Sequence, residues 1–293
     1  MQQSVRDYWI TFNDPLEGRV NIMYLDVKGY VSTGIGNKID ETARDNFAPT
    51  AQEREKSLAA ASSLRWLVND VDTVATPEEI AEDWDRVKSH LELASQGHGA
   101  FRPHTRLHLE DNEIDRHVFA KLDEMECVLL EQRGEHFGGF VSWPANAQLA
   151  TMSMCWATGP KFRFPKFQEH VKARSWVGAA DECHFTPDVG TIIIRNKLDR
   201  AHFLFARDVE DQGLPMDQIV LGVSDVFGVQ GALLALGFKP LSQDGVDGPC
   251  TQGKVKEFQT ANGLAENGAF DDPDTVYALT SQLTGRGFRV FGA

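Results

Sequence analysis

Two acidic residues near the start of the chain, Glu17 and Asp26, have side chains that could act as an acid and a base. Hydrolysis of a glycosidic bond uses one protonated carboxyl group to release the leaving oxygen, and one carboxylate to activate water or attack the sugar. Glu17 follows apolar Leu16, and a carboxyl group beside apolar residues can be desolvated and kept protonated. A carboxylate on a polar strand stays charged. This difference predicts Glu17 as the acid and Asp26 as the base.

The chain has 43 acidic residues, so the types and spacing of Glu17 and Asp26 alone do not indicate a catalytic site. The surrounding sequence has to support that interpretation. A short helix is expected at residues 4–12, interrupted by Asn13-Asp14-Pro15 because proline removes a backbone donor and constrains the residue before it. Residues 20–35 combine apolar, β-branched and aromatic types with glycine breaks, which predicts a small antiparallel hairpin or sheet. Asp26 and Ser32 would lie on or beside its strands.

Helical spacing of apolar residues dominates the next part of the chain, and glycine and proline mark the breaks. Helices are expected at about residues 51–68, 77–93, 111–133, 144–157, 165–173, 176–182 and 190–206. The second of these begins with a capping box of Thr76 and Glu79 and has Pro77 at its first position. The main domain is therefore expected to be α+β and mainly helical, with a small antiparallel sheet.

The hairpin region carries a specific pattern: Glu17-Gly18, then Tyr24-Leu25-Asp26, then Gly29-Tyr30-Val31-Ser32-Thr33-Gly34-Ile35-Gly36-Asn37. This pattern closely resembles the catalytic signature of the phage-type lysozyme family, the muramidases of T-even bacteriophages. The resemblance resumes over residues 107–131, 147–159, 164–183 and 195–206. The resemblance implies a lysozyme-like catalytic domain spanning residues 1–207, in which residues 38–106 would be an enlarged or altered interlobe region.

The resemblance implies catalytic roles for three residues. Glu17 would be the general acid, Asp26 would position or activate water, and Ser32 would help to hold that water. Ser32 stands where the family usually has threonine, and serine keeps the hydroxyl but lacks the methyl group that restricts its rotamer. Asn37 stands where the family often has histidine, so a charge partner of the acidic cleft is expected to be lost.

The same resemblance implies substrate-binding roles for Tyr30, Thr33, Gly34 and Arg200. Arg200 lies on the helix expected at residues 190–206, and the matching helix of the family closes the lobe with arginines near the cleft. The alternative for this arginine is an exposed ion pair, which stabilises a protein only slightly.

The C-terminal part has a different pattern, with Asp244-Gly245 and Gly248-Pro249 before Thr251 and a Phe258–Leu264 segment that ends in Gly-Leu. It looks like the common three-helix peptidoglycan-binding domain. Helices are expected at residues 226–236, 251–262 and 274–283. We expect a linker at residues 208–224 and a small three-helix domain at residues 225–293.

Composition excludes several classes of partner. The net charge of −14 opposes binding to nucleic acid and to anionic membranes, and no uninterrupted apolar run approaches the ~20 residues that span a bilayer. The N-terminus lacks the pattern of a secretory signal. Four widely spaced cysteines without a CxxC pair suggest free thiols, consistent with synthesis in the cytoplasm. We expect neither a metal nor another cofactor, since His98, His104 and His108 lack a ligand partner motif.

Together these features predict a peptidoglycan hydrolase that cleaves the β-1,4 bond between N-acetylmuramic acid and N-acetylglucosamine by inverting acid/base hydrolysis. The alternatives are a weakly active or inactive peptidoglycan-binding protein and a chitin-type glycosidase. The enzyme would act in the periplasm or on the cell wall, as a phage endolysin released through a holin or as an antibacterial effector exported by specialised secretion. The acidic balance favours the effector, for which an immunity or inhibitor protein is an expected partner.

Overall fold

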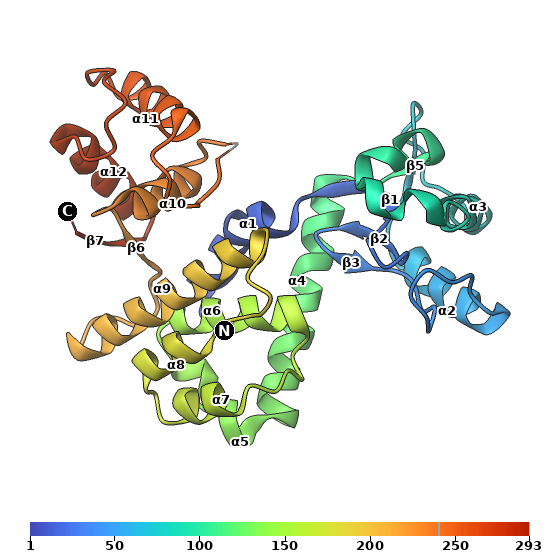
Figure 1. Cartoon of the computed structure of the whole chain (residues 1–293), viewed down its shortest axis with the longest axis horizontal. Helices are drawn as coiled ribbons and strands as arrows, with labels where there is room; N and C mark the ends of the chain where they lie inside the picture. Colours follow the sequence, from blue (N-terminus) through green and yellow to red (C-terminus); the bar gives the residue numbers. More distant parts are fainter. Residues whose placement is uncertain (240, 293) are drawn as a thin grey trace. The chain divides into compact units, whose positions relative to one another are not determined.

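The computed structural model describes residues 1–239 and 241–292, and the chain divides into two compact units. Unit 1 comprises Met1–Leu16 and Leu122–Ala293, and unit 2 comprises Glu17–Lys121. Helices α1 (Gln3–Glu17) and α4 (Asp111–Cys127) both cross a boundary between the units. The predicted mainly helical α+β fold with small antiparallel sheets is confirmed (Figure 1).

Unit 2 is built around a small antiparallel sheet in the order β1-β2-β3. Its strands are β1 (Val20–Leu25), β2 (Val31–Gly34) and β3 (Asn37–Lys38), while β4 (Leu67–Val68) pairs with β5 (Leu107–His108). The other elements are α2 (Ala51–Ser62), α3 (Pro77–Lys88) and the 3-10 helices η1 (Leu91–Gln96) and η2 (His98–His104). All of residues 38–106 therefore belong to unit 2, where α3 packs against β1 and β2.

The pairing of β1 with β2 sets which side chains share a face of the sheet. Tyr24 lies opposite Ser32, and Val20 lies opposite Gly34, so β1 advances four residues while β2 advances two. The extra residues of β1 form a bulge. Because directly opposed residues project to the same face, the Tyr24 and Ser32 side chains are neighbours.

Local sequence explains where the helices of unit 2 begin. Thr76 and Glu79 form the predicted capping box at α3, with Pro77 following the cap, and Thr50 and Glu53 form a second box at α2. In each box the threonine hydroxyl accepts from the third helical N–H while the glutamate carboxylate accepts from the N–H of the cap residue.

Several helix ends differ from the sequence prediction, among them α3, which ends at Lys88 and not near residue 93, and the following three. Helix α1 does not stop at Asn13-Asp14-Pro15 but continues to Glu17, because Pro15 lies in the last turn and buried Phe12 and Leu16 anchor one face. Helix α2 ends at Ser62, since Leu67–Val68 pairs with β5 instead of extending the helix. Helix α4 ends at Cys127 and passes into a π-helical turn, η3 (Val128–Gln132).

Unit 1 is a bundle of helices around an aromatic core. Its helices include α5 (Gly134–Phe137), α6 (Ala145–Thr158), α7 (Pro165–Lys172), α8 (Trp176–Glu182) and α9 (Thr191–Asp211), with a short 3-10 turn, η4 (Phe140–Ser142), before α6. Helix α6 is buried along nearly all of its length and packs along α9. Helix α1 joins this core through Trp9, whose ring lies 5.5 Å from that of Trp156.

The C-terminal part of unit 1 contains the three predicted helices, α10 (Val226–Leu236), α11 (Pro249–Ala261) and α12 (Pro273–Gly285). Two strands that the sequence did not predict, β6 (Val220–Gly222) and β7 (Arg289–Phe291), pair in parallel. Within the linker expected at residues 208–224, α9 extends to Asp211 and β6 begins at Val220.

Candidate active site

The two candidate carboxylates lie in unit 2, at the ends of adjacent elements. Glu17 is the last residue of α1, and Asp26 follows directly after β1; both are half-buried. Tyr24 of β1 is close to both of them: its burial, then the charges of Asp26 and Glu17, raise the pKa of Tyr24 to about 12. The structure therefore brings both carboxylates within electrostatic reach of one phenol.

The loop from Asp26 to Tyr30 fixes the Asp26 side chain. Its Oδ1 accepts hydrogen bonds from the backbone N–H of Lys28 at 2.9 Å and of Tyr30 at 3.0 Å. The backbone closes the same turn, since Asp26 N donates to Tyr30 O and Gly29 N donates to Asp26 O. The carboxylate is thus held by the loop that carries it and leaves its Oδ2 for other contacts.

Residues from the segment 38–106 support this loop from outside. The Lys88 Nζ donates to the Gly29 carbonyl at 2.7 Å, and the Asn46 N–H donates to the Lys28 carbonyl at 2.7 Å. Gly29 has φ of +76°, and an added Cβ would lie 2.7 Å from Asn46 Oδ1 and 3.1 Å from Leu91 Cδ2. Glycine is required here both by the backbone conformation and by the close approach of Asn46 and Leu91.

A buried ion pair supports the same brace. Lys88 and Asp40 have side-chain exposures of 5% and 0%, and Lys88 Nζ lies 2.8 Å from Asp40 Oδ2. Burial raises the pKa of Asp40, but hydrogen bonds from Lys88, Thr42 and the Val31 N–H outweigh it and hold the pKa below its ordinary value. Asp40 therefore ties α3 to β2 in its charged form.

The hydroxyl groups of the signature point into the protein. Ser32 is buried, and its Oγ lies 3.5 Å from the Tyr30 carbonyl, at the limit of a hydrogen bond. Thr33 is also buried and donates from Oγ1 to the Val20 carbonyl at 3.4 Å. Of the two, Ser32 shares the sheet face of Tyr24, so it is the hydroxyl nearer to the carboxylate pair.

The residues given substrate-binding roles have different surroundings. Tyr30 donates from Oη to Asp45 Oδ1 at 2.7 Å, and this hydrogen bond, with burial and nearby charge, raises the pKa of Tyr30 to about 12. Thr33 and Gly34 line a cavity of about 10 Å³, far smaller than a sugar ring. Arg200 lies in unit 1, on α9, and forms an exposed ion pair with Asp181 at 3.3 Å.

Tyr24 and Lys88 are the site residues to which sequence reasoning gave no role. Tyr24 belongs to the Tyr24-Leu25-Asp26 part of the signature, and because side chains alternate along a strand, Tyr24 and Asp26 could have been expected on the same face. Nothing local marks Lys88, which lies 59 residues from the carbonyl that it contacts. Lys88 does lie next to Val87 on the buried face of α3, which also carries Trp84. A lysine on a buried helix face could have indicated that Lys88 has a buried partner.

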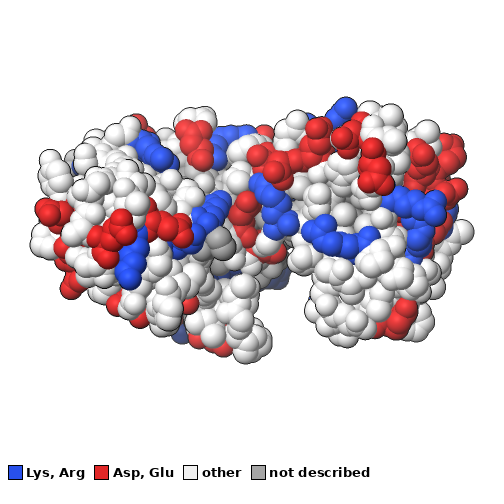
Figure 2. Space-filling view, turned by 90° about the horizontal axis from the view of Figure 1, so that it is seen from above, with Lys and Arg blue, Asp and Glu red and all other residues white. Residues whose placement is uncertain are grey.

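Four further features concern metal-ligating side chains, membrane helices, cysteines and surface charge. Residues 1–239 and 241–292 contain no group of three or more His, Cys, Asp or Glu side chains placed to hold a metal ion. In the same residues, no helix combines the length and the apolar composition needed to cross a bilayer. All four cysteines are free thiols. On the face shown in Figure 2, acidic patches are interrupted by basic side chains, without a broad basic patch.

In the C-terminal helices, a buried glutamine holds the first interhelical turn. Gln230 of α10 donates from Nε2 to Asp244 Oδ1 and to Thr251 Oγ1, both at 2.9 Å, and its Oε1 accepts from the Gly245 N–H at 2.8 Å. Thr251 lies in the first turn of α11. One amide side chain therefore joins the end of the turn to the next helix.

A second buried glutamine repeats this arrangement one helix later. Gln259 of α11 donates from Nε2 to Asn267 Oδ1 at 2.7 Å and to Thr275 Oγ1 at 2.9 Å, and its Oε1 accepts from the Gly268 N–H at 2.9 Å. Thr275 lies in the first turn of α12. The two turns are thus built on one plan, with glutamine, Asx-glycine and threonine in the same order.

Comparison with known proteins identifies this part of the chain. Residues 223–279 match the family described as "Putative peptidoglycan binding domain". The chain therefore carries a peptidoglycan-binding domain, which confirms the prediction for its C-terminal part and suggests association with the cell wall. No curated protein and no solved structure matches the chain.

Proposed function

We propose that this protein is an N-acetylmuramidase that cleaves the β-1,4 bond between N-acetylmuramic acid and N-acetylglucosamine in peptidoglycan. The observation that carries the proposal is that Glu17 ends α1 and Asp26 follows β1, both near enough to Tyr24 for their charges to raise its pKa, with Asp26 fixed by two backbone N–H groups. The peptidoglycan-binding domain supports the choice of polymer over chitin, because it would hold the same chain on the wall.

In the proposed reaction, Glu17 donates a proton to the glycosidic oxygen as the bond from C1 breaks. Asp26 takes a proton from the water that attacks C1 from the opposite face, so the anomeric configuration is inverted. Solvent then returns a proton to Glu17 and removes one from Asp26. This route requires the carboxyl groups to be roughly 6.5–9.5 Å apart, whereas a covalent route requires about 5–5.5 Å.

Glu17→Gln tests the acid and Asp26→Asn tests the base. Asparagine keeps an Oδ1 acceptor for the Lys28 and Tyr30 N–H groups, so its effect on the loop is small. Each change should lower the release of reducing ends from purified peptidoglycan by about 10²–10⁴-fold. Binding to insoluble peptidoglycan should not change.

Glu41→Gln is the matched control, since Glu41 is an exposed glutamate of the same unit. It should leave the rate unaltered. If Glu17→Gln clears peptidoglycan at the rate of Glu41→Gln, Glu17 is not the acid. Identification of the new reducing-end sugar by mass spectrometry distinguishes a muramidase from other glycosidases, and digestion of chitin in parallel tests the third alternative.

A second candidate, a wall-binding protein with weak or no hydrolysis, is favoured by one observation. The Ser32 hydroxyl, expected to hold the water, is buried, and among residues 1–239 and 241–292 its one hydrogen bond is the long contact to the Tyr30 carbonyl. Capture on insoluble peptidoglycan without release of soluble fragments would support this candidate. Ser32→Thr, which restores the residue usual in the family, should raise hydrolysis if the hydroxyl is involved.

The proposed place of action is the periplasm or the cell wall, reached through a holin or by specialised secretion. The net charge of −14 favours an exported effector over an endolysin that is held electrostatically. Expression directed to the periplasm of a susceptible bacterium should then cause lysis, and cytoplasmic expression alone should not. Lysis by the Glu17→Gln protein would argue against an enzymatic cause.

A further inference from the structure

A cavity in unit 1 is lined by several basic side chains. It has a volume of about 810 Å³ and lies between the end of η3, the loop before α7 and the first turns of α7. Arg133, Lys161, Arg163 and Lys166 line it. Four basic residues at one cavity are unexpected in a chain whose net charge is −14.

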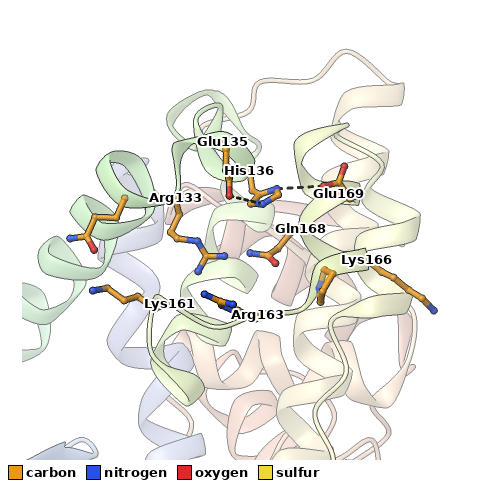
Figure 3. Close-up of a pocket in the computed structure, with 10 residues that line it drawn as sticks. Arg133, Glu135, His136, Lys161, Arg163, Lys166, Gln168 and Glu169 are labelled. Carbon is orange, nitrogen blue, oxygen red and sulfur yellow. Dashed lines mark ion pairs between the residues drawn. The ribbon is translucent and has the colours of Figure 1, made fainter.

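Figure 3 shows how three of the polar groups are arranged. The guanidinium groups of Arg133 and Arg163 and the amide of Gln168 point toward one another, while Lys161 and Lys166 extend outward. Arg133 is held in place, since its Nη1 donates to the Phe162 carbonyl at 3.0 Å and its guanidinium lies 5.9 Å from the Phe137 ring centroid. Arg163 has no hydrogen bond or ion pair with any residue that the structure describes.

Gln168 provides an independent observation that a ligand is needed. Its side chain is 4% exposed, yet its Nε2 has no hydrogen-bond partner among the described residues. A buried donor without an acceptor costs free energy, and nearly all such groups in proteins are satisfied. A ligand with acceptor oxygens in the cavity would satisfy this donor together with the two guanidinium groups.

The acidic residues of the cavity do not neutralise this cluster. Glu135 and Glu169 both face His136, whose Nε2 lies 3.1 Å from Glu135 and whose Nδ1 lies 3.7 Å from Glu169 (Figure 3). Arg133 follows the π-helical turn η3, and such turns often occur at functional sites. The cavity therefore has a cationic wall formed by Arg133 and Arg163 and a separate acidic wall around His136.

We propose that this cavity is a binding site for an oxyanion group, held by Arg133, Arg163 and the Gln168 amide. Guanidinium groups match the paired oxygens of carboxylates and phosphates, and the amide adds a neutral donor. The shared chemistry is a group with two or more negative charges, either a phosphate or a pair of neighbouring carboxylates. The volume leaves room for a larger molecule that carries the group.

Isothermal titration of the full chain with inorganic phosphate and with citrate, at constant ionic strength, tests the proposal. At least one of the anions should bind saturably, and the preferred anion identifies the source of the charge. Arg163→Gln should weaken that binding about tenfold, because it removes a charge-assisted hydrogen bond. Arg102→Gln is the matched control, an exposed arginine in unit 2, and should change the affinity less than twofold.

Gln168→Leu separates a ligand-binding role from a purely structural one. If the amide binds the anion, this variant should weaken binding several-fold while its free energy of unfolding stays equal to or above that of the wild type, since an unsatisfied buried donor is removed. The proposal is overturned if neither anion binds saturably, if Arg102→Gln weakens binding as much as Arg163→Gln, or if Gln168→Leu leaves the affinity unchanged.

Discussion

Removal of the Lys88 ammonium group should destabilise unit 2 and also slow the proposed hydrolysis of peptidoglycan. Lys88→Met keeps most of the aliphatic side chain but leaves Asp40 buried without its cation, and removes the donor to the Gly29 carbonyl. At 2.8 Å the attraction of the pair is about 6 kcal/mol for an effective dielectric constant of about 20. Because desolvation offsets part of it, breaking such a pair costs about 3–5 kcal/mol.

The double variant Lys88→Met with Asp40→Asn shows whether this loss comes from the unpaired charge. With both charges removed, most of the stability should return, to within about 1–2 kcal/mol of the wild type. Hydrolysis should stay low in the double variant, since the Gly29 carbonyl still lacks its donor and the Asp26 loop is less well held.

Hydrogen exchange of backbone amides in residues 17–121, read by mass spectrometry, measures the stability of unit 2 separately from unit 1. Lys56→Met, at an exposed lysine of α2, is the control and should change neither exchange nor rate. A loss below about 1 kcal/mol in Lys88→Met, or equal losses in the single and double variants, would refute the reasoning.

Three further predictions follow from the backbone, the buried charges and the C-terminal turns. Gly29→Ala should lower the free energy of unfolding by more than the ~1–3 kcal/mol expected from its positive φ alone. Gly97→Ala is the control, because Gly97 has φ of +79° and nothing lies near an added Cβ. In urea unfolding this control should lose only the ~1–3 kcal/mol that positive φ costs. Burial raises the pKa of the Asp199 carboxyl group to about 7. The folded state therefore binds the carboxyl proton more tightly than the unfolded state does. As pH rises from about 4 to 7, ionisation of Asp199 lowers the free energy of unfolding. Asp199→Asn should therefore gain stability relative to the wild type over this pH range. The difference between their free energies of unfolding should grow by at most about 4 kcal/mol. A difference that does not depend on pH would contradict the raised pKa of Asp199. Gln230→Leu should lower stability by about 1–3 kcal/mol, because the Gly245 N–H loses its acceptor, and should reduce capture on insoluble peptidoglycan; unchanged capture and stability would show that the turn does not need this amide.

Features that depend on nearby residues were predictable from the sequence. The capping box of Thr76 and Glu79, the hairpin at residues 20–35 and helix α10 all depend on spacings of a few residues, and the structure has them where they were expected. The order of glutamate, aspartate and glycines in the signature also depends only on residues that are close together in the sequence. Asp26 was expected on or beside a strand and directly follows β1, whereas Glu17 was expected after a turn and is instead the last residue of α1.

Features that depend on distant residues were not predictable. Helix α1 passes through Pro15 because packing of Phe12 and Leu16 outweighs one missing hydrogen bond. Strands β4 and β5 have two residues each, too few to show an alternating pattern. The brace on the Asp26 loop joins Gly29 to Lys88 across 59 residues, so no pattern around either residue could reveal it.

Unit 1 is discontinuous, and this has a consequence for how the protein assembles. Its first helix packs through Trp9 on Trp156 and through Tyr8 on Phe288, with 5.2 Å between the latter two ring centroids. During translation α1 therefore emerges long before the segments that cover its apolar side. Such long-range closure slows folding, and a ribosome-bound nascent chain would expose an aromatic stripe to chaperones until the segment with Phe288 has been synthesised.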